Sequence, residues 1–398
     1  MVRTILEHTW TVRSDGATRL VHRFLRICDR LLVEYLSRYR AEYGPNFGSS
    51  GAIVALHLGQ SGRRNMIIDT HAHFFPPAVL DFYRDAGGDR VQVVTNEQGG
   101  IAVLFDGKVF HPSLPLAIFD FDAHIDGMDT AGVDMHAVSV PPPMVYWSEP
   151  AQGLELCRLA NDALSALAVE QPSRIVPVAS VPLQAPDLAV EELRRVVTEL
   201  GHKMVVVGSN IDGTELDDPS LEPFWAEAEK LGVAVFVHPI LGSVTGQLPM
   251  DSYRLNLSLG MVTDTTIAAA RVICAGLIDR YPELRMSFAH LGGLLPFVGD
   301  RIDYFLRNQP GASIQAEGNF NDYVGRFWYD VVCYSERMLK AALEWVSSDR
   351  LMMGTDSPFM GDSTLDIKAV IDGSPLLSAD ERAALYDGNA RQFLRLEA

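Results

Sequence analysis

Two histidines separated by one residue, His71 and His73, end the apolar run that begins at Met66. In an extended strand, side chains two positions apart point to the same side, so both imidazoles can reach one ion. Asp69 precedes them by two residues and would lie on the same face. An HxH pair alone is a moderate signal, because two surface or core histidines often have this spacing by chance. The pair indicates a metal site only if other segments supply further ligands.

Three later segments place a histidine or an aspartate where an apolar run stops and a turn begins. They are FVHP with His238, FAHLGG with His290 and GTDSP with Asp356. Taken singly, each residue is more often an ordinary turn residue. In a (β/α)8 barrel, however, the carboxyl ends of all strands meet at one mouth, where active sites lie. Four strand ends that carry such residues therefore favour one shared site.

The residue types at these strand ends suit a mononuclear catalytic metal. Three neutral imidazoles and one carboxylate, from His71, His73, His238 and Asp356, match Zn²⁺, while Mn²⁺, Fe²⁺ or Co²⁺ are also possible. A metal with an open coordination position binds water and lowers the pKa of that water to about 7. His290 is then the expected catalytic acid/base, because imidazole titrates near neutral pH.

The segments that carry these residues alternate between short β-branched runs and longer helical patterns. Eight runs are predicted strands: 66–69, 136–140, 175–178, 204–207, 234–237, 285–288, 327–332 and 351–353. Seven segments are predicted helices: 153–170, 187–200, 221–231, 264–281, 295–306, 336–346 and 379–394. Because a helical segment follows most of the strands, the pattern predicts an α/β protein with a parallel (β/α)8 TIM barrel.

Two segments depart from this alternation. Residues 75–124 are too long for a simple loop and contain glycine-rich turn signals, which predicts a small β insertion after the first strand. Residues 1–65 hold ten arginines and five acids, whereas residues 66–398 hold 23 basic and 46 acidic residues. This break predicts an N-terminal extension, an amphipathic helix plus linker, ahead of the metal-dependent barrel of 66–398. One hypothesis is that the enzyme naturally starts at Met66, and that residues 1–65 are an accessory segment or a mis-assigned upstream extension. The alternative is that they form an N-terminal helix packed on the barrel.

Composition excludes several classes of function. A net charge of -18 disfavours binding to nucleic acids and anionic membranes. No apolar run reaches the ~18 residues that a membrane helix needs. The four cysteines are widely spaced and form no CxxC pair, which favours reduced thiols in a cytoplasmic protein over zinc knuckles or thioredoxin-like redox motifs.

From Met66 to its end the chain resembles the amidohydrolase superfamily, in particular the branch of aminocarboxymuconate-semialdehyde decarboxylase and related aromatic-acid decarboxylases. The resemblance covers about five-sixths of the chain and rests on IDTHAHFFP, DGKVF, SVPPPMVYWSEP, VPLQAPDLAVEEL, FVHP, GLIDRYPELRMSFAHLGG and GTDSPF. It implies zinc on the four ligands named above, His290 as the acid/base, and a homodimer. The fourth-strand run VVVGSN contains no lysine, so a second metal bridged by a carbamylated lysine is not implied.

The same resemblance implies a non-oxidative decarboxylase that acts on a small aromatic or muconate-type carboxylic acid. The alternative is a metal-dependent hydrolase or hydratase of a ring-cleavage product or an amide, because the metal ligands alone do not separate these reactions.

The substrate-binding residues are predicted less directly. The family uses an arginine to hold the substrate where this chain has His111, and imidazole cannot form a bidentate clamp on carboxylate. Either the substrate lacks that carboxylate, or Lys108, His111 or Arg307 holds it. Arg307 would act from the neighbouring subunit, unless it is a solvated residue at a helix end. Trp147 and Phe297 would line an apolar wall, unless they belong to the core.

Overall fold

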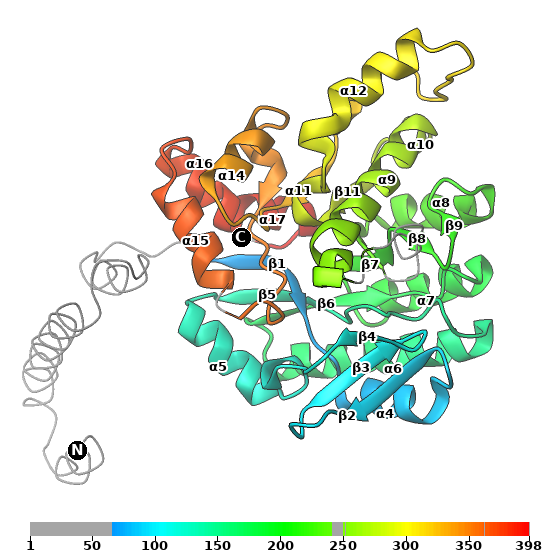
Figure 1. Ribbon diagram of the computed structural model, residues 1–398, viewed down its shortest axis with the longest axis vertical. Coiled ribbons are helices and arrows are strands. Elements are labelled where there is room, and N and C mark those ends of the chain that lie inside the picture. The colour runs from blue at the N-terminus through cyan, green and yellow to red at the C-terminus, as the bar shows by residue number, and fades with distance from the viewer. Residues whose placement is uncertain (1–65, 241–249, 251, 362, 398) are drawn as a thin grey trace, which may run out of the picture. The chain divides into compact units, whose positions relative to one another are not determined.

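The computed structural model describes residues 66–240, 250, 252–361 and 363–397 (Figure 1). Eight of its strands form one parallel sheet in the order β1-β5-β6-β7-β10-β11-β12-β13. Their bounds are β1 Ile68–His73, β5 Met135–Ser139, β6 Ile175–Ser180, β7 Met204–Gly208, β10 Ala234–His238, β11 Arg285–Phe288, β12 Trp328–Asp330 and β13 Leu351–Met352. All eight predicted strands are therefore present.

The first and last strands of this sheet lie side by side. The backbone N–H of Thr70 donates to the carbonyl of Met353 over 2.9 Å, and a parallel bridge joins Ala72 to Ser357. These contacts bring the two edges together into a nearly closed barrel, which confirms the predicted (β/α)8 fold. The strands are buried on both faces, as the apolar run Met204–Gly208 illustrates, because helices cover the outside of a parallel barrel.

Helices alternate with the strands and surround the sheet (Figure 1). Those that match predicted segments include α6 Pro150–Glu170, α7 Pro186–Thr198, α8 Glu222–Leu231, α12 Leu295–Asn308 and α14 Glu336–Leu343. The predicted helix 264–281 is instead divided into α9 Met261–Cys274 and α10 Leu277–Arg280. Gly276 separates the two because it adopts a left-handed conformation, with φ at 65°.

The C-terminal part also differs in detail from the expected elements. The predicted helix 379–394 consists of α16 Ala379–Ala383, the π-helical turn η7 Ala384–Gly388 and α17 Asn389–Leu394. A further helix that the sequence analysis did not predict, α15 Ser363–Gly373, follows the segment after β13.

Between β1 and β5 the chain forms an antiparallel three-stranded sheet. Helices precede and follow this sheet along the chain. The order is α4 Pro77–Ala86, β2 Val91–Thr95, β3 Ile101–Phe105, β4 Lys108–His111, η1 Leu116–Ile118 and α5 Phe121–Ala131. Figure 1 shows the small sheet beside α4. The sequence predicts strands in this region but neither α4 nor α5. It is β4 that ends in His111.

The predicted helix and linker of residues 1–65 lie outside the described residues. One described helical stretch, Ser252–Cys274, is long and apolar enough to cross a membrane, with a mean hydropathy of 1.3. The sequence did not predict such a stretch. Half of its apolar window is buried inside the protein, and α9 has buried residues along its length, as is equally typical of a core helix.

Candidate metal centre and active site

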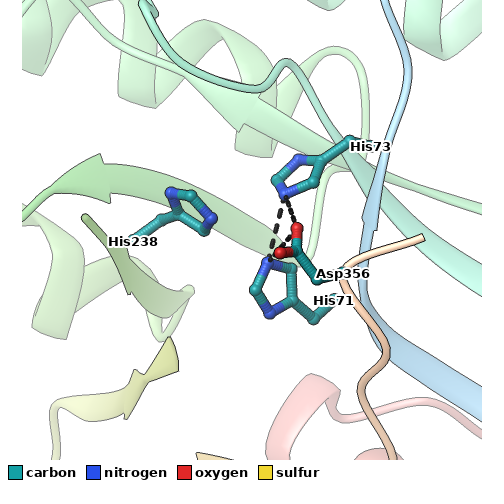
Figure 2. A group of neighbouring side chains, drawn as sticks. All are labelled: His71, His73, His238 and Asp356. Atoms are coloured by element: carbon teal, nitrogen blue, oxygen red, sulfur yellow. Dashed lines mark hydrogen bonds and ion pairs between the residues drawn. The ribbon is translucent and has the colours of Figure 1, made fainter. Parts of the chain in front are cut away.

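Four side chains predicted as metal ligands converge at the carboxyl end of the barrel (Figure 2). His71 and His73 belong to β1, His238 is the last residue of β10, and Asp356 follows β13. One ligand atom from each residue lies within 4.8 Å of the others. The Nε2 atoms of His71 and His73 are 3.1 Å apart. Two nitrogens bound to a tetrahedral zinc ion at 2.0–2.1 Å would lie about 3.3 Å apart, so this spacing suits a shared ion.

Contacts at the Nδ1 atoms fix the orientation of the His71 and His73 rings. Nδ1 of His71 lies 2.7 Å from Oδ2 of Asp330, and Nδ1 of His73 lies 3.1 Å from the hydroxyl of Ser139. When an oxygen holds Nδ1, the ring presents Nε2 to the centre as the ligand atom. Asp330 and Ser139 are the last residues of β12 and β5, so these supports also come from strand ends.

The third histidine follows the same pattern. Nδ1 of His238 lies 2.7 Å from its neighbouring carbonyl at Pro239. Its Nε2 atom is buried and has no hydrogen-bond partner among the described residues. A buried polar atom without a partner costs about 1–3 kcal/mol. A metal ion bound at this nitrogen would remove that cost, so the four residues fit a divalent cation.

The electrostatics of the cluster also favour a cation. Burial disfavours protonated His71, but the carboxylates of Asp330 and Asp356 outweigh burial and raise the pKa of His71 to about 10. Burial likewise disfavours ionised Asp356, yet His71 and hydrogen bonds from His290, His71 and His73 hold the pKa of that carboxyl well below its ordinary value. The centre therefore stabilises a positive charge, and a metal ion would take the place of the proton.

Asp69 lies beside the cluster and connects the two segments that carry His71 and Asp356. Its carboxylate accepts hydrogen bonds from the backbone N–H of His71 at 2.9 Å and of Thr355 at 3.2 Å, and from the Thr355 hydroxyl. These bonds join β1 to the segment that carries Asp356. They fix the distance between the histidine pair and the carboxylate ligand.

Gly354 allows the close approach behind His71. A Cβ atom at this position would lie 2.6 Å from Cβ of Asp330 and 3.1 Å from Cβ of His71. Real Cβ atoms essentially never come within 3.0 Å of a heavy atom from a residue that is not adjacent in the chain. A side chain at residue 354 would therefore displace the contact between Asp330 and His71.

His290 lies next to the four ligands without joining their cluster. Its ring centroid is 5.2 Å from that of His71 and 5.6 Å from that of His238, and its Nε2 is 3.6 Å from Oδ2 of Asp356. His290 and Leu291 both have φ at 56°, a conformation that costs about 1–3 kcal/mol for such residues and often occurs at active sites. Nδ1 of His290 is buried without a partner among the described residues. This position suits a group that exchanges a proton with a bound molecule.

His111 also lies near the centre. Its ring stacks on Phe359 with centroids 4.4 Å apart and planes at 6°, and Phe359 in turn contacts the His73 ring at 5.5 Å. Phe359 was not among the predicted site residues, although it lies in the GTDSPF motif. It also missed Asp330, whose signal is a carboxylate at the end of the apolar run FWYD.

The structure places the other predicted substrate residues differently. Trp147 is buried, donates to the carbonyl of Met144 at 3.0 Å and packs edge-on against Tyr83. Phe297 is 69% exposed on α12, and Arg307 forms an ion pair with Asp303 on the same helix. Within the described parts of the chain, no hydrogen bond or ring contact joins these three residues to the metal ligands.

Comparison with known proteins connects this site to one family. The family model described as amidohydrolase matches residues 68–396. A 2-amino-3-carboxymuconate-6-semialdehyde decarboxylase of Dictyostelium discoideum is 32% identical over 84% of this chain and 93% of its own length.

Solved structures show the same likeness. A 2,6-dihydroxybenzoate decarboxylase in complex with 2,6-dihydroxybenzoate superposes with a TM-score of 0.68 and 26% identity, over 84% of this chain and all of the other. A dihydroxybenzoic acid decarboxylase of Polaromonas sp., with bound manganese and the inhibitor 2-nitroresorcinol, has a TM-score of 0.68 and 25% identity over 84% of this chain and 98% of its own.

Proposed function

The chain belongs to the amidohydrolase family, and on this basis we propose that it is a metal-dependent, non-oxidative decarboxylase of an aromatic or muconate-type carboxylic acid. The observation that carries the proposal is the convergence of three imidazoles and a carboxylate on one point, with His290 beside them. The relatives that share this fold over most of their length are decarboxylases of small carboxylic acids.

The reaction needs one bond broken and one proton supplied. The bond between the substrate carbon and its carboxylate breaks, CO₂ leaves, and the electron pair stays on carbon, which then takes a proton. A divalent metal supplies an electrophilic centre that binds and polarises oxygen atoms. His290 is the proposed donor of the proton, because its ring lies against the ligand cluster and its Nδ1 atom lacks a protein partner among the described residues.

We propose zinc as the metal, held by His71, His73, His238 and Asp356. Neutral imidazoles with one carboxylate suit zinc, whereas the related Polaromonas enzyme contains manganese. Metal-depleted protein reloaded separately with Zn²⁺ and Mn²⁺ should bind one ion per chain in both cases. The ion that copurifies with the protein from its natural source identifies the native metal.

The predicted substrate residues remain part of the proposal. His111 and Trp147 would contribute from the same chain. Phe297 and Arg307 lie on α12, which runs outward from the barrel in Figure 1, so they would act at the site of a second copy. Exposed aromatic side chains on α12, Phe297 at 69% and Tyr304 at 61%, support a homodimer that covers this helix. Sedimentation velocity of the wild type and of Phe297→Asp would test the dimer.

Two further assignments follow the same family pattern. We propose that the catalytic unit begins at Met66, because β1 starts at Ile68 and the family match begins at residue 68. A shortened protein that starts at Met66 should keep its fold and activity.

We also propose a cytoplasmic location, since Cys157, Cys274 and Cys333 are free thiols. Fractionation of the source cells would test it.

The decisive experiment is a screen of carboxylated aromatics and ring-cleavage products against metal-loaded protein, scored by CO₂ release. We expect release with at least one acid, and none with His290→Ala, which should still bind the metal. Incorporation of ¹⁸O from water into product without CO₂ would instead indicate a hydrolase or hydratase. Loss of metal from His290→Ala would make His290 a ligand rather than the acid/base.

A further inference from the structure

Arg254 reaches the vicinity of the active site from η4, the turn Ser252–Arg254 that precedes η5 Asn256–Gly260 and α9. Its Nη2 atom donates to the carbonyl of Phe110 over 3.0 Å, and Phe110 is the neighbour of His111 in β4. We propose that Arg254, beside His111, binds a second anionic group of the substrate and so determines which acids are accepted. This inference rests on the proposed function, in which the carboxylate that is lost lies at the metal centre.

A continuous series of contacts leads from the metal ligands to Arg254. The ring of His73 contacts Phe359 with centroids 5.5 Å apart, and Phe359 stacks on His111 at 4.4 Å. The main chain of β4 then connects His111 to the carbonyl that holds Arg254. Arg254 is thus linked to the metal ligands through β4, His111 and Phe359. A substrate that binds at the proposed metal centre and extends along these rings could present a second substituent to Arg254.

His111 provides a hydrogen-bonding group at this place without a charge. Its Nε2 atom is buried and lacks a hydrogen-bond partner in the described parts of the chain. Burial, together with the nearby His73 and Arg254, lowers the pKa of His111 to about 3, so the imidazole is neutral at neutral pH. The ring donates its single N–H to the backbone carbonyl of Pro142, so Nε2 is left as a hydrogen-bond acceptor that can face a hydroxyl group of a ligand. It cannot supply the positive charge that holds an anion.

Arg254 supplies that charge. A guanidinium stays protonated in proteins and carries five N–H donors, of which the bond to Phe110 uses one. In a chain with a net charge of -18, an anionic ligand needs such a local cation. Arg254 lies in an exposed turn, where Tyr253 and Arg254 both adopt left-handed backbone conformations, with φ at 60° and 54°. Because the residue is exposed, a ligand can reach it from solvent.

The proposal can be tested by binding, without turnover. Metal-loaded full-length protein is titrated calorimetrically with benzoate and with the three benzenedicarboxylate isomers. We expect at least one dicarboxylate to bind the wild type roughly 10- to 100-fold more tightly than benzoate, the range expected for a charge-assisted contact. In Arg254→Gln this preference should fall to within about threefold, while benzoate affinity stays unchanged. Arg254→Lys should retain part of it.

A matched control separates this contact from a general effect of charge. Arg326 is exposed and lies just before β12, at the end of the barrel opposite the metal centre. Arg326→Gln removes the same charge and should leave the preference as in the wild type. Unchanged circular dichroism and melting temperature would show that the Arg254 variants are folded. A variant that does not fold would be replaced by Arg254→Met, which keeps an unbranched apolar stem without the charge.

The outcomes for this inference and for the proposed function can be told apart. If no acid releases CO₂ but the binding preference depends on Arg254, the reaction is wrong and the anion site stands. If CO₂ is released but Arg254→Gln keeps the preference of the wild type, the anion site is wrong and the reaction stands. A wild type that binds every dicarboxylate no better than benzoate would also overturn the anion site.

Discussion

Asp330 accepts a hydrogen bond from Nδ1 of His71 over 2.7 Å, and both groups are fully buried. This contact determines which nitrogen of His71 faces the proposed metal centre, and it places a second carboxylate directly behind His71. Asp330 would therefore increase the negative potential at the centre without occupying a coordination position. The proposed metal site consequently depends on β12 as well as on the three strands that carry or precede the proposed ligands.

Substitution of Asp330 should weaken metal binding while the fold survives. Asp330→Asn keeps the shape of the side chain but removes its charge, so we expect metal affinity to fall roughly 10- to 100-fold. Competition with a chromophoric chelator would measure the change. Asp349→Asn, at an exposed aspartate, is the matched control and should bind metal as the wild type does. Equal affinities in the two variants would show that Asp330 does not orient the ligand.

Removal of the carboxylate ligand should have a larger effect. In Asp356→Ala the three imidazoles lose their only anionic partner among the four ligands, so we expect metal content after dialysis to drop well below one ion per chain. Elemental analysis would measure it. Calorimetry of the same variant should show that added Zn²⁺ no longer raises its melting temperature. Full metal occupancy together with full activity would contradict the proposed ligand set.

A single methyl group at Gly354 should disturb the centre. Gly354→Ala would place Cβ 2.6 Å from Asp330 and 3.1 Å from His71, which forces one of them to move. We expect weaker metal binding and a free energy of unfolding lower by about 1–3 kcal/mol. Gly373→Ala is the control, because nothing lies within 4 Å of a Cβ atom there. Denaturant unfolding of both variants, with and without metal, separates the two effects. If Gly354→Ala bound metal and unfolded like the wild type, the proposed crowding at this position would be refuted.

Stability should decrease in mild acid because of buried neutral histidines away from the metal. His202 is 1% exposed, and its Nε2 lies 2.8 Å from the Ser165 hydroxyl. Burial, with a smaller contribution from Arg195, lowers the pKa of His202 from 6.5 to about 4. The unfolded chain therefore binds a proton below pH 6.5 that the folded protein does not accept until about pH 4. This one residue should cost about 2 kcal/mol of stability between pH 7 and pH 5.

Urea unfolding at several pH values would test this expectation. His202→Gln removes the titrating group, so its free energy of unfolding should fall less between pH 7 and pH 5 than that of the wild type. The other histidines titrate in both proteins, and the difference between the two curves isolates His202. Parallel curves would mean that His202 does not contribute to the loss of stability in acid.

Much of the fold could be predicted from the chain because its signals are local. Apolar β-branched runs of strand length alternate with helical patterns, and each predicted strand ends within a few residues of an observed one. Boundaries that depend on neighbouring segments were predicted less well. The division at Gly276 is an example, because a Cβ there would lie 3.1 Å from Ala316, a contact that appears only after folding.

The sequence by itself determined which residues could bind a metal, since imidazole and carboxylate groups at the ends of strands can be recognised from their type and position. Tertiary structure decided what surrounds them. The support of His71 by Asp330, of His73 by Ser139 and the approach of Arg254 to β4 join residues from 66 to 259 positions apart. Such contacts arise from barrel closure and side-chain packing, which bring distant segments together without leaving a periodic pattern in the chain.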